Sequence, residues 1–143
     1  MKDIDIHIVR SHKELEKVFT IRRTVFMEEM NVSPELEFDG LDDHATHVLM
    51  TVKKQPIGCA RLRQTDQGMK LERVAILPRY RKKGFGAMLM NYLLQYCQQH
   101  HYHFVYLYAQ INACEFYKQF GFQPRGDVFI EAGITHQAME KTL

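Results

Sequence analysis

The chain lacks the features of a membrane-spanning protein, a zinc protein or a disulfide-rich domain. None of its apolar runs is long enough to cross a bilayer, and the residues after Met1 lack the apolar core of a secretory signal. The three cysteines, Cys59, Cys97 and Cys114, are odd in number and widely spaced, which predicts reduced thiols and a cytoplasmic location. No Cys/His spacing resembles a zinc site, and the acidic segment 35–43 lacks the EF-hand spacing, so no metal is expected.

The chain also lacks a strong charge of one sign. Its net charge of +2 is too small to favour nucleic acid or a membrane surface as the main partner. No repeat, low-complexity segment or linker interrupts the 143 residues, so we expect one domain over residues 1–143 with a real hydrophobic core. Four cations are concentrated at 79–83, and this local cluster favours a small anionic ligand.

The hydrophobic pattern predicts an α/β domain with a mixed sheet. Alternating residues at 4–8 predict a half-buried strand, and Ser11 with Glu14 is a capping-box start for a helix that continues to about Met30. The three strands that precede the long helix are expected to form an antiparallel meander with short turns. We expect these strands at 47–53, 57–64 and 69–77, a turn at 54–56, the long helix at 84–101, a strand at 104–109, a short helix at 112–120 and one or two strands in 128–143.

Residues 71–88 are the most informative stretch, because they predict a buried strand, a basic turn and the start of the long helix. The first N–H groups of a helix have no partner within the helix, and the helix dipole favours negative charge there. Gly84 and Gly86 would let a bulky anion approach the backbone, and the cations at 81–83 would add charge. The stretch therefore predicts a cradle for a diphosphate, with an ordinary loop of solvated charges as the alternative.

The segment 35–43 is unusually acidic, with five carboxylates around Gly40. Its composition predicts a polar loop with strong turn chemistry. The expected outcome is a solvated acidic loop, and the functional alternative is a rim that attracts a cationic substrate.

Two motifs resemble those of the GCN5-related N-acetyltransferases, the GNAT superfamily. Residues 81–86, Arg-Lys-Lys-Gly-Phe-Gly, are similar to the acetyl-CoA signature R/Q-x-x-G-x-G/A and lie between a predicted strand and a long helix, as in the family. Asn112 with residues 116–122 is similar to the downstream motif N-x-x-A-x-x-F-Y-x-x-x-G-F. The N-terminal part, with 22–29, 37–42 and His47, resembles the small ElaA/YjcF-like acetyltransferases.

The resemblance implies the GNAT fold, a mixed and mostly antiparallel sheet of six to seven strands with about four helices on both faces. It implies direct transfer of acetyl from acetyl-CoA to the primary amine of a small molecule of the amino acid, amino sugar or polyamine type. An acetyl-CoA-binding sensor or interaction module without turnover is the alternative, and Cys114 as a covalent nucleophile is the rival mechanism. We expect no nucleic-acid or membrane partner, and a homodimer is the default assembly.

The resemblance also implies roles for single residues. Tyr117 is the expected general acid for the departing thiolate, with a core aromatic as the alternative. Glu72 is the expected base for the amine, directly or through water, with a surface salt bridge to Arg73 or Arg61 as an equal alternative. Glu28 and His47 are the other candidates for the base. Asn112 would bond the pantetheine arm or cap its helix. The residues expected to bind acetyl-CoA are Val74, Ala75, Ile76, Arg81, Lys82, Lys83, Gly84, Phe85, Gly86, Ala87, Asn112 and Tyr117. The residues expected around the amine are Glu28, Glu29, His47 and Glu72.

Overall fold

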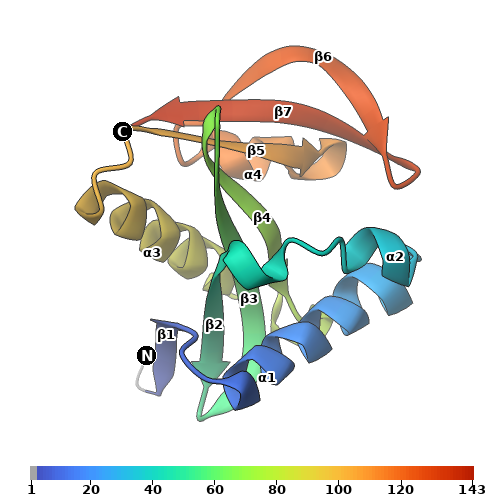
Figure 1. The fold of residues 1–143 in the computed structure, drawn as a ribbon, viewed down its shortest axis with the longest axis vertical. Helices are drawn as coiled ribbons and strands as arrows, with labels where there is room; N and C mark the ends of the chain where they lie inside the picture. The colour runs from blue at the N-terminus through green and yellow to red at the C-terminus, as the bar shows by residue number, and fades with distance from the viewer. Residues whose placement is uncertain (1–2) are drawn as a thin grey trace.

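The computed structural model describes residues 3–143 as a seven-stranded sheet with helices on both faces (Figure 1). The strand order is β1-β2-β3-β4-β5-β7-β6, and only the β4/β5 pair is parallel, which confirms the expected mixed, mostly antiparallel sheet. The strands are β1 (Ile4–Ile8), β2 (Thr46–Val52), β3 (Gln55–Thr65), β4 (Gly68–Ile76), β5 (Phe104–Gln110), β6 (Gln123–Glu131) and β7 (Ile134–Thr142). The helices are α1 (His12–Arg22), α2 (Pro34–Glu37), α3 (Phe85–Gln99) and α4 (Cys114–Lys118), with a π-helix η1 (Arg23–Glu29) and 3₁₀ turns η2 (Asp42–His44), η3 (Pro78–Tyr80) and η4 (Ile111–Ala113).

The first helical segment begins where expected but changes type along its length. The Ser11 hydroxyl accepts the Glu14 N–H at 3.2 Å, as an N-cap should. The Glu14 carboxylate accepts from the Arg10 N–H instead of closing the capping box. After α1 the chain continues as the π-helix η1, whose end is marked by a bond from the Met30 N–H to the Val25 carbonyl. Such widened turns are frequent at functional sites.

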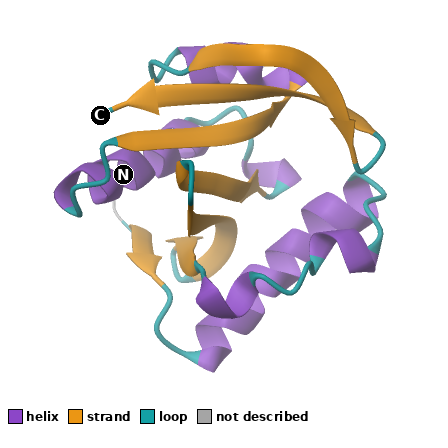
Figure 2. Ribbon diagram, turned by 45° about the horizontal axis from the view of Figure 1, so that its top comes forward, coloured by secondary structure: helices purple, strands orange, loops and turns teal. Residues whose placement is uncertain are grey.

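Two hydrophobic cores lie on opposite faces of the sheet. One is formed by the buried side of α3, including Leu89 and Leu93, against the strands, and α4 packs on the same side. The other is formed by Val18 and Ile21 of α1 against β2, β3 and β4. Figure 2 shows helices on both sides of the strands. None of the helices within residues 3–143 is long and apolar enough to cross a membrane.

The β2–β3 hairpin turns earlier than the sequence predicted. Lys53 and Lys54 have φ values of 49° and 66°, the left-handed pair that a two-residue hairpin turn requires. Pro56, expected in the turn at 54–56, instead lies in β3 opposite Thr51, next to a register shift in β2. The prediction was wrong because Pro was taken as a turn residue, although an irregular position in a strand also tolerates it.

The sheet opens between β4 and β5. Their parallel pairing covers only residues 69–71 and 105–107. Beyond it β4 stays paired with β3 through a bulge at Arg73, whose φ is 52°. In Figure 1, β4 runs down the page while β5 crosses it nearly horizontally. The edge of β4 that faces β5 is therefore unpaired over 72–76.

Candidate active site

A cavity of about 490 Å³ lies where β4 and β5 separate. Tyr117 reaches it from the face of the sheet that α3 and α4 cover. Arg63, Lys70 and Glu72 reach it from the other face, and the segment after η1 adds apolar side chains such as Met30. Because the sheet is open here, side chains from both faces line one space.

The start of α3 presents a row of free backbone amides. Gly84 is the N-cap with a φ of 87°, and no side chain caps the helix. The first amide of this region to donate within residues 3–143 is that of Met88, to the Gly84 carbonyl at 3.2 Å, and the N–H groups of 82–87 donate to no acceptor there. A Cβ built on Gly84 would meet nothing within 4 Å. This open helix end fits the diphosphate of coenzyme A.

The amide row lies beside the cavity and not in its wall. None of the residues 82–87 lines the cavity, whereas Val74 and Tyr117 do. A Cβ on Gly86 would lie 3.4 Å from the Phe116 ring, so the first turn of α3 packs beside α4. The two features together describe an extended site that runs from the α3 start to the opening of the sheet.

Arg81 does not lie free for a diphosphate, as the sequence had suggested. Its terminal nitrogens donate to Glu29 at 2.6 and 2.7 Å, and its Nε–H donates to the Ile76 carbonyl at 2.9 Å. The bond from Arg81 lowers the pKa of Glu29. Arg81, which was expected to bind the cofactor, thus pairs with Glu29, which was expected near the amine. The pair connects η1 to the end of β4.

Tyr117 lies in α4 among aromatic rings, with ring centroids 5.2 Å from Phe116 and 6.1 Å from Phe122. Its hydroxyl bonds to no group within residues 3–143, and the side chain lines the cavity. Burial raises its pKa to about 12, so the phenol stays protonated at neutral pH. The same helix carries Cys114, whose Sγ–H points to the Gln110 carbonyl at 3.7 Å. The structure shows no partner that would activate this thiol within the described chain.

Asn112 does not cap the helix that follows it. It lies exposed in η4, while Ala113 is the N-cap of α4 and no side chain caps that helix. It is also absent from the cavity wall. The cap interpretation is wrong because η4 places this residue one position too early.

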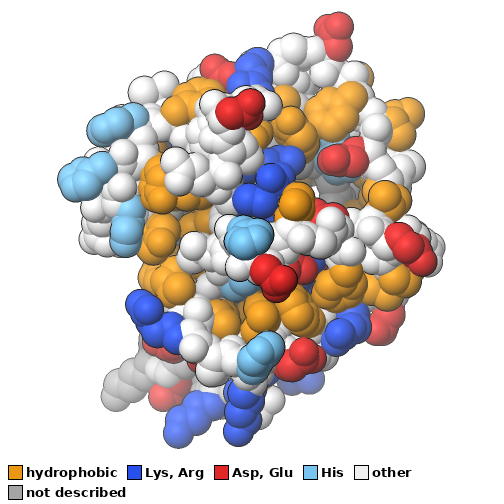
Figure 3. Space-filling view, viewed as in Figure 1, with side chains coloured by type: hydrophobic (Ala, Val, Ile, Leu, Met, Phe, Trp, Pro, Cys, Tyr) orange, Lys and Arg blue, Asp and Glu red, His pale blue; other side chains and the backbone are white. Residues whose placement is uncertain are grey.

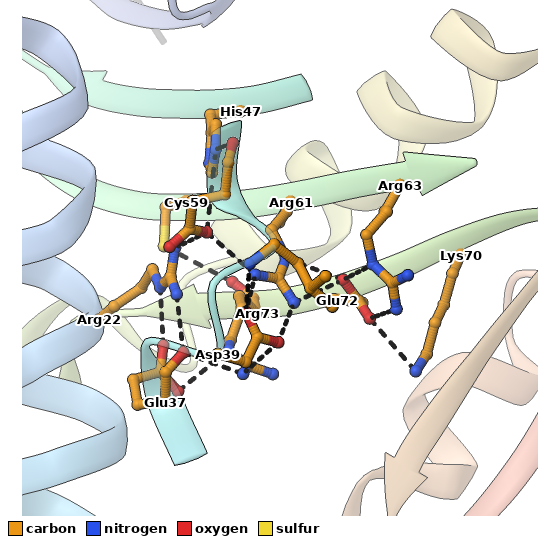
Figure 4. A network of polar contacts seen from close by, with 12 residues as sticks. Arg22, Glu37, Asp39, His47, Cys59, Arg61, Arg63, Lys70, Glu72 and Arg73 are labelled. Atoms are coloured by element: carbon orange, nitrogen blue, oxygen red, sulfur yellow. Dashed lines mark hydrogen bonds and ion pairs between the residues drawn. The ribbon is translucent and has the colours of Figure 1, made fainter. Parts of the chain in front are cut away.

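Glu72 lies at the centre of three cations (Figure 4). Its carboxylate is 2.8 Å from Arg61, 2.8 Å from Arg63 and 3.2 Å from Lys70, and the residue is 9% exposed. Burial alone would raise its pKa, but the bonds from Arg63 and the charges of Arg61 and Lys70 outweigh it and lower the pKa to about 2. Of the two expected roles, the structure shows the salt bridge with Arg61. This salt bridge is buried, whereas a surface one was expected. A carboxylate with this pKa is a weak base.

The acidic segment is not the solvated loop that was expected. Glu37 is 2% exposed, and the side chains of Asp39 and Asp42 are 26% and 13% exposed and contact arginines. Glu35 and Asp43 are exposed. Burial raises the pKa of Glu37, and the arginines lower those of Asp39 and Asp42 against the effect of burial. The ion pairs are Arg22–Glu37 (2.7 Å), Arg22–Asp42 (2.7 Å), Arg61–Asp39 (2.9 Å), Arg61–Asp42 (2.9 Å) and Arg73–Glu37 (3.0 Å).

His47 and Glu28, expected around the amine, lie away from the cavity. His47 is 6% exposed, its Nε2–H donates to the Asp42 carbonyl at 2.9 Å, and burial lowers its pKa. Glu28 is exposed on η1, and neither residue lines the cavity. Of the expected site residues, Glu72, Val74 and Tyr117 therefore line the cavity together, and His47 and Glu28 do not.

Two residues of the cavity wall, Arg63 and Lys70, were missed by sequence reasoning. They stand opposite each other on the β3–β4 hairpin, as Arg61 and Glu72 do. The signal was present, since charges at alternate positions on both arms of a hairpin share one face of the sheet. Figure 3 shows Lys and Arg side chains gathered over β4 among hydrophobic ones.

The fold and this site are consistent with one family of enzymes. The chain belongs to the GNAT acetyltransferase family, since residues 9–143 match the Acetyltransferase (GNAT) domain. It is an N-acetyltransferase of the GNAT type, and this family uses acetyl-CoA.

Individual relatives are similar along nearly their whole length. The uncharacterised N-acetyltransferase YjcF of Bacillus subtilis is 33% identical over 135 residues, covering 94% of this chain and 96% of YjcF. The protein ElaA of Escherichia coli is 30% identical over 141 residues, covering 94% and 92%. The crystal structure of E. coli ElaA superposes with a TM-score of 0.85 at 29% identity, covering 96% of this chain and 99% of that one.

A more distant structure shares the fold. It is a GNAT family acetyltransferase from Elizabethkingia anophelis with acetyl-CoA bound. It is 15% identical, with a TM-score of 0.80 and complete coverage of both chains.

Proposed function

We propose that this protein transfers the acetyl group of acetyl-CoA to the primary amine of a small molecule. The observation that carries the proposal is the opening between β4 and β5, which holds a cavity lined by Tyr117 with the free amides at 82–87 beside it. Membership of the GNAT family and the acetyl-CoA bound to the distant relative support the same cofactor. The free cysteines support a reducing compartment such as the cytoplasm.

The main chain supplies most of the proposed cofactor site. The amides of 82–87 would bind the diphosphate, and the exposed Lys82 and Lys83 would add charge in place of Arg81. The unpaired edge of β4 at Val74 and Ala75 would pair with the pantetheine arm as an added strand does. Acetyl-CoA, when bound, supplies the activated acyl group.

Tyr117 is proposed as the general acid. Its side chain lines the cavity, and its protonated hydroxyl has no competing acceptor within residues 3–143, so it would be free to donate to the departing sulfur. A backbone N–H on the open edge of β4 would stabilise negative charge on the carbonyl oxygen. Glu72 is proposed as a positioning residue that fixes Arg63 and Lys70, since its low pKa argues against a role as the base.

The proposal is tested by two measurements on the intact chain. Calorimetry with acetyl-CoA should detect binding, and release of free thiol should rise when a suitable primary amine is added. A panel of amino acids, amino sugars and polyamines covers the proposed acceptors. Absence of heat at millimolar acetyl-CoA, together with no thiol release for any amine, would reject the function.

A further inference from the structure

The wall of the cavity that β3, β4 and the acidic segment form carries three cations, Arg63, Lys70 and Arg73, and three carboxylates, Glu37, Asp39 and Glu72. Its ion-pair network joins five cationic side chains to four carboxylates (Figure 4). Every carboxylate of this network is therefore already neutralised by an arginine or a lysine. The cations are Arg22, Arg61, Arg63, Lys70 and Arg73, and the carboxylates are Glu37, Asp39, Asp42 and Glu72.

The cations nearest the cavity keep unused donors. Arg63 contacts Glu72 through Nε and Nη2, and its Nη1 has no acceptor within residues 3–143. Lys70 makes one ion pair, at 3.2 Å to Glu72, and lies 3.9 Å from the centroid of the Tyr108 ring. Their side chains are 23% and 14% exposed, and both line the cavity. Each is thus held in place by Glu72 and keeps donors that no acceptor within residues 3–143 uses.

Arg73 adds a buried donor to the same wall. Its Nε lies 3.0 Å from Glu37 Oε1, but the geometry makes no hydrogen bond, and this buried nitrogen has no other acceptor within the described residues. Arg73 also lines the cavity. The opposite rim, formed by β6 and β7, carries the exposed Glu131 and the half-buried His136.

This distribution of charge selects between kinds of acceptor. A carboxylate or a phosphate can accept charge-assisted hydrogen bonds from a guanidinium and an ammonium at once. A polyamine would instead bring further positive charge against Arg63 and Lys70, whose carboxylate partner Glu72 is already shared among three cations. Like charges repel more strongly in such a partly desolvated place than in water.

We propose that the acceptor is an amine that also carries an anionic group, a carboxylate or a phosphate, and that Arg63 and Lys70 bind this group. The inference rests on the proposed function and narrows its substrate class. Amino acids and amino sugar phosphates fit it, whereas polyamines do not. Glu131 on the opposite rim suits the ammonium end of such a zwitterion before the amine is deprotonated.

Matched acceptor pairs test this on the unmodified protein. An amino acid is compared with its carboxamide, an amino sugar phosphate with the free amino sugar, and both with spermidine, each by thiol release at saturating acetyl-CoA. We expect kcat/KM for the anionic member of one pair to exceed that of its neutral partner by about 10-fold to 100-fold, the size of a charge-assisted bond. The pair that shows the ratio identifies carboxylate or phosphate as the recognised group. Equal rates within both pairs, or spermidine as the best acceptor, would overturn the inference while leaving acetyl transfer intact.

Variants of Arg63 and Lys70 test whether these two side chains bind the anionic group of the acceptor. Arg63→Gln and Lys70→Gln should each raise KM for the anionic amine by about 10-fold with KM for acetyl-CoA unchanged, and Arg63→Lys should recover part of the loss. Lys13→Gln, on the exposed side of α1, is the matched control. An unchanged KM in correctly folded Arg63→Gln and Lys70→Gln would contradict the assignment, and if either variant fails to fold, the ratios from the matched acceptors decide. Absence of thiol release with every amine would instead reject the proposed function.

Discussion

Replacing Glu72 by Gln distinguishes its proposed role, as the centre of an ion-pair cluster, from the role of base that its sequence position had suggested. In the folded protein its pKa falls from 4.5 to about 2, which at 1.36 kcal/mol per pH unit corresponds to on the order of 3 kcal/mol of stability at neutral pH. Glu72→Gln also leaves three cations close together. We expect a loss of about 3 kcal/mol and a fall in Tm of roughly 10 °C.

The contribution of Glu72 to the free energy of unfolding should change with pH in one direction. Because the folded-state pKa is depressed, the stabilisation is complete above about pH 5 and is lost as the pH falls towards 2. The difference in stability between the wild type and Glu72→Gln, measured by urea unfolding, should therefore shrink between pH 5 and pH 3 and vanish only near pH 2. Glu115→Gln, which removes an exposed partner of Lys118, should change stability by less than about 0.5 kcal/mol.

The Glu72→Gln variant also tests whether Glu72 acts as the catalytic base. A base with a pKa near 2 cannot produce an acidic limb near neutral pH, so the pH–rate profile of Glu72→Gln should keep that limb. A stability difference that does not change between pH 7 and pH 3 would refute the depressed pKa. Loss of the limb in a variant of normal stability would restore Glu72 as the base.

Three further predictions concern other parts of the molecule. Tyr117→Phe should lower kcat by about 100-fold with little change in acetyl-CoA affinity, and unchanged turnover would remove Tyr117 from the reaction. Gly84→Ala should cost about 1 kcal/mol, because its φ of 87° strains any side chain, and should weaken acetyl-CoA binding in calorimetry. Gly133→Ala, with a φ of 74° in the β6–β7 turn, should cost the same and leave binding intact, so equal affinities in both variants would count against the amide cradle. His7 is bonded to two carboxylates that raise its pKa above 6.5 against the effect of burial, so it should stabilise the protein below that pH and lose this effect as the pH rises through the raised pKa. The gap in Tm between wild type and His7→Asn should therefore narrow as the pH is raised above 6.5, and a constant gap would contradict it.

The strand–turn–helix at 71–88 could be predicted because its signals are local. The apolar run of the strand and the glycines of the turn act within a few residues, and α3 begins at Phe85, one residue from the predicted start. The N-cap at Ser11 was predictable for the same reason. The opening of the sheet was not predictable from these signals, since it depends on how few residues of β4 and β5 pair.

The ion pairs escaped prediction because their partners are far apart in sequence. Arg81 meets Glu29 across 52 residues, and Arg61 meets Asp39 across 22. Only the folded sheet brings these groups together. A cluster of acidic residues therefore looked solvated, although it closes over arginines from α1, β3 and β4.

The two halves of the proposed site should respond differently to mutation. The cofactor half is built from backbone amides and an open strand edge, which most side-chain replacements leave in place. The acceptor half is built from a few charged side chains on the β3–β4 hairpin and the segment that packs over it. Changes there can exchange one amine for another without loss of the thioester donor, so sequence drift in this chain should alter its choice of acceptor well before it abolishes acetyl transfer.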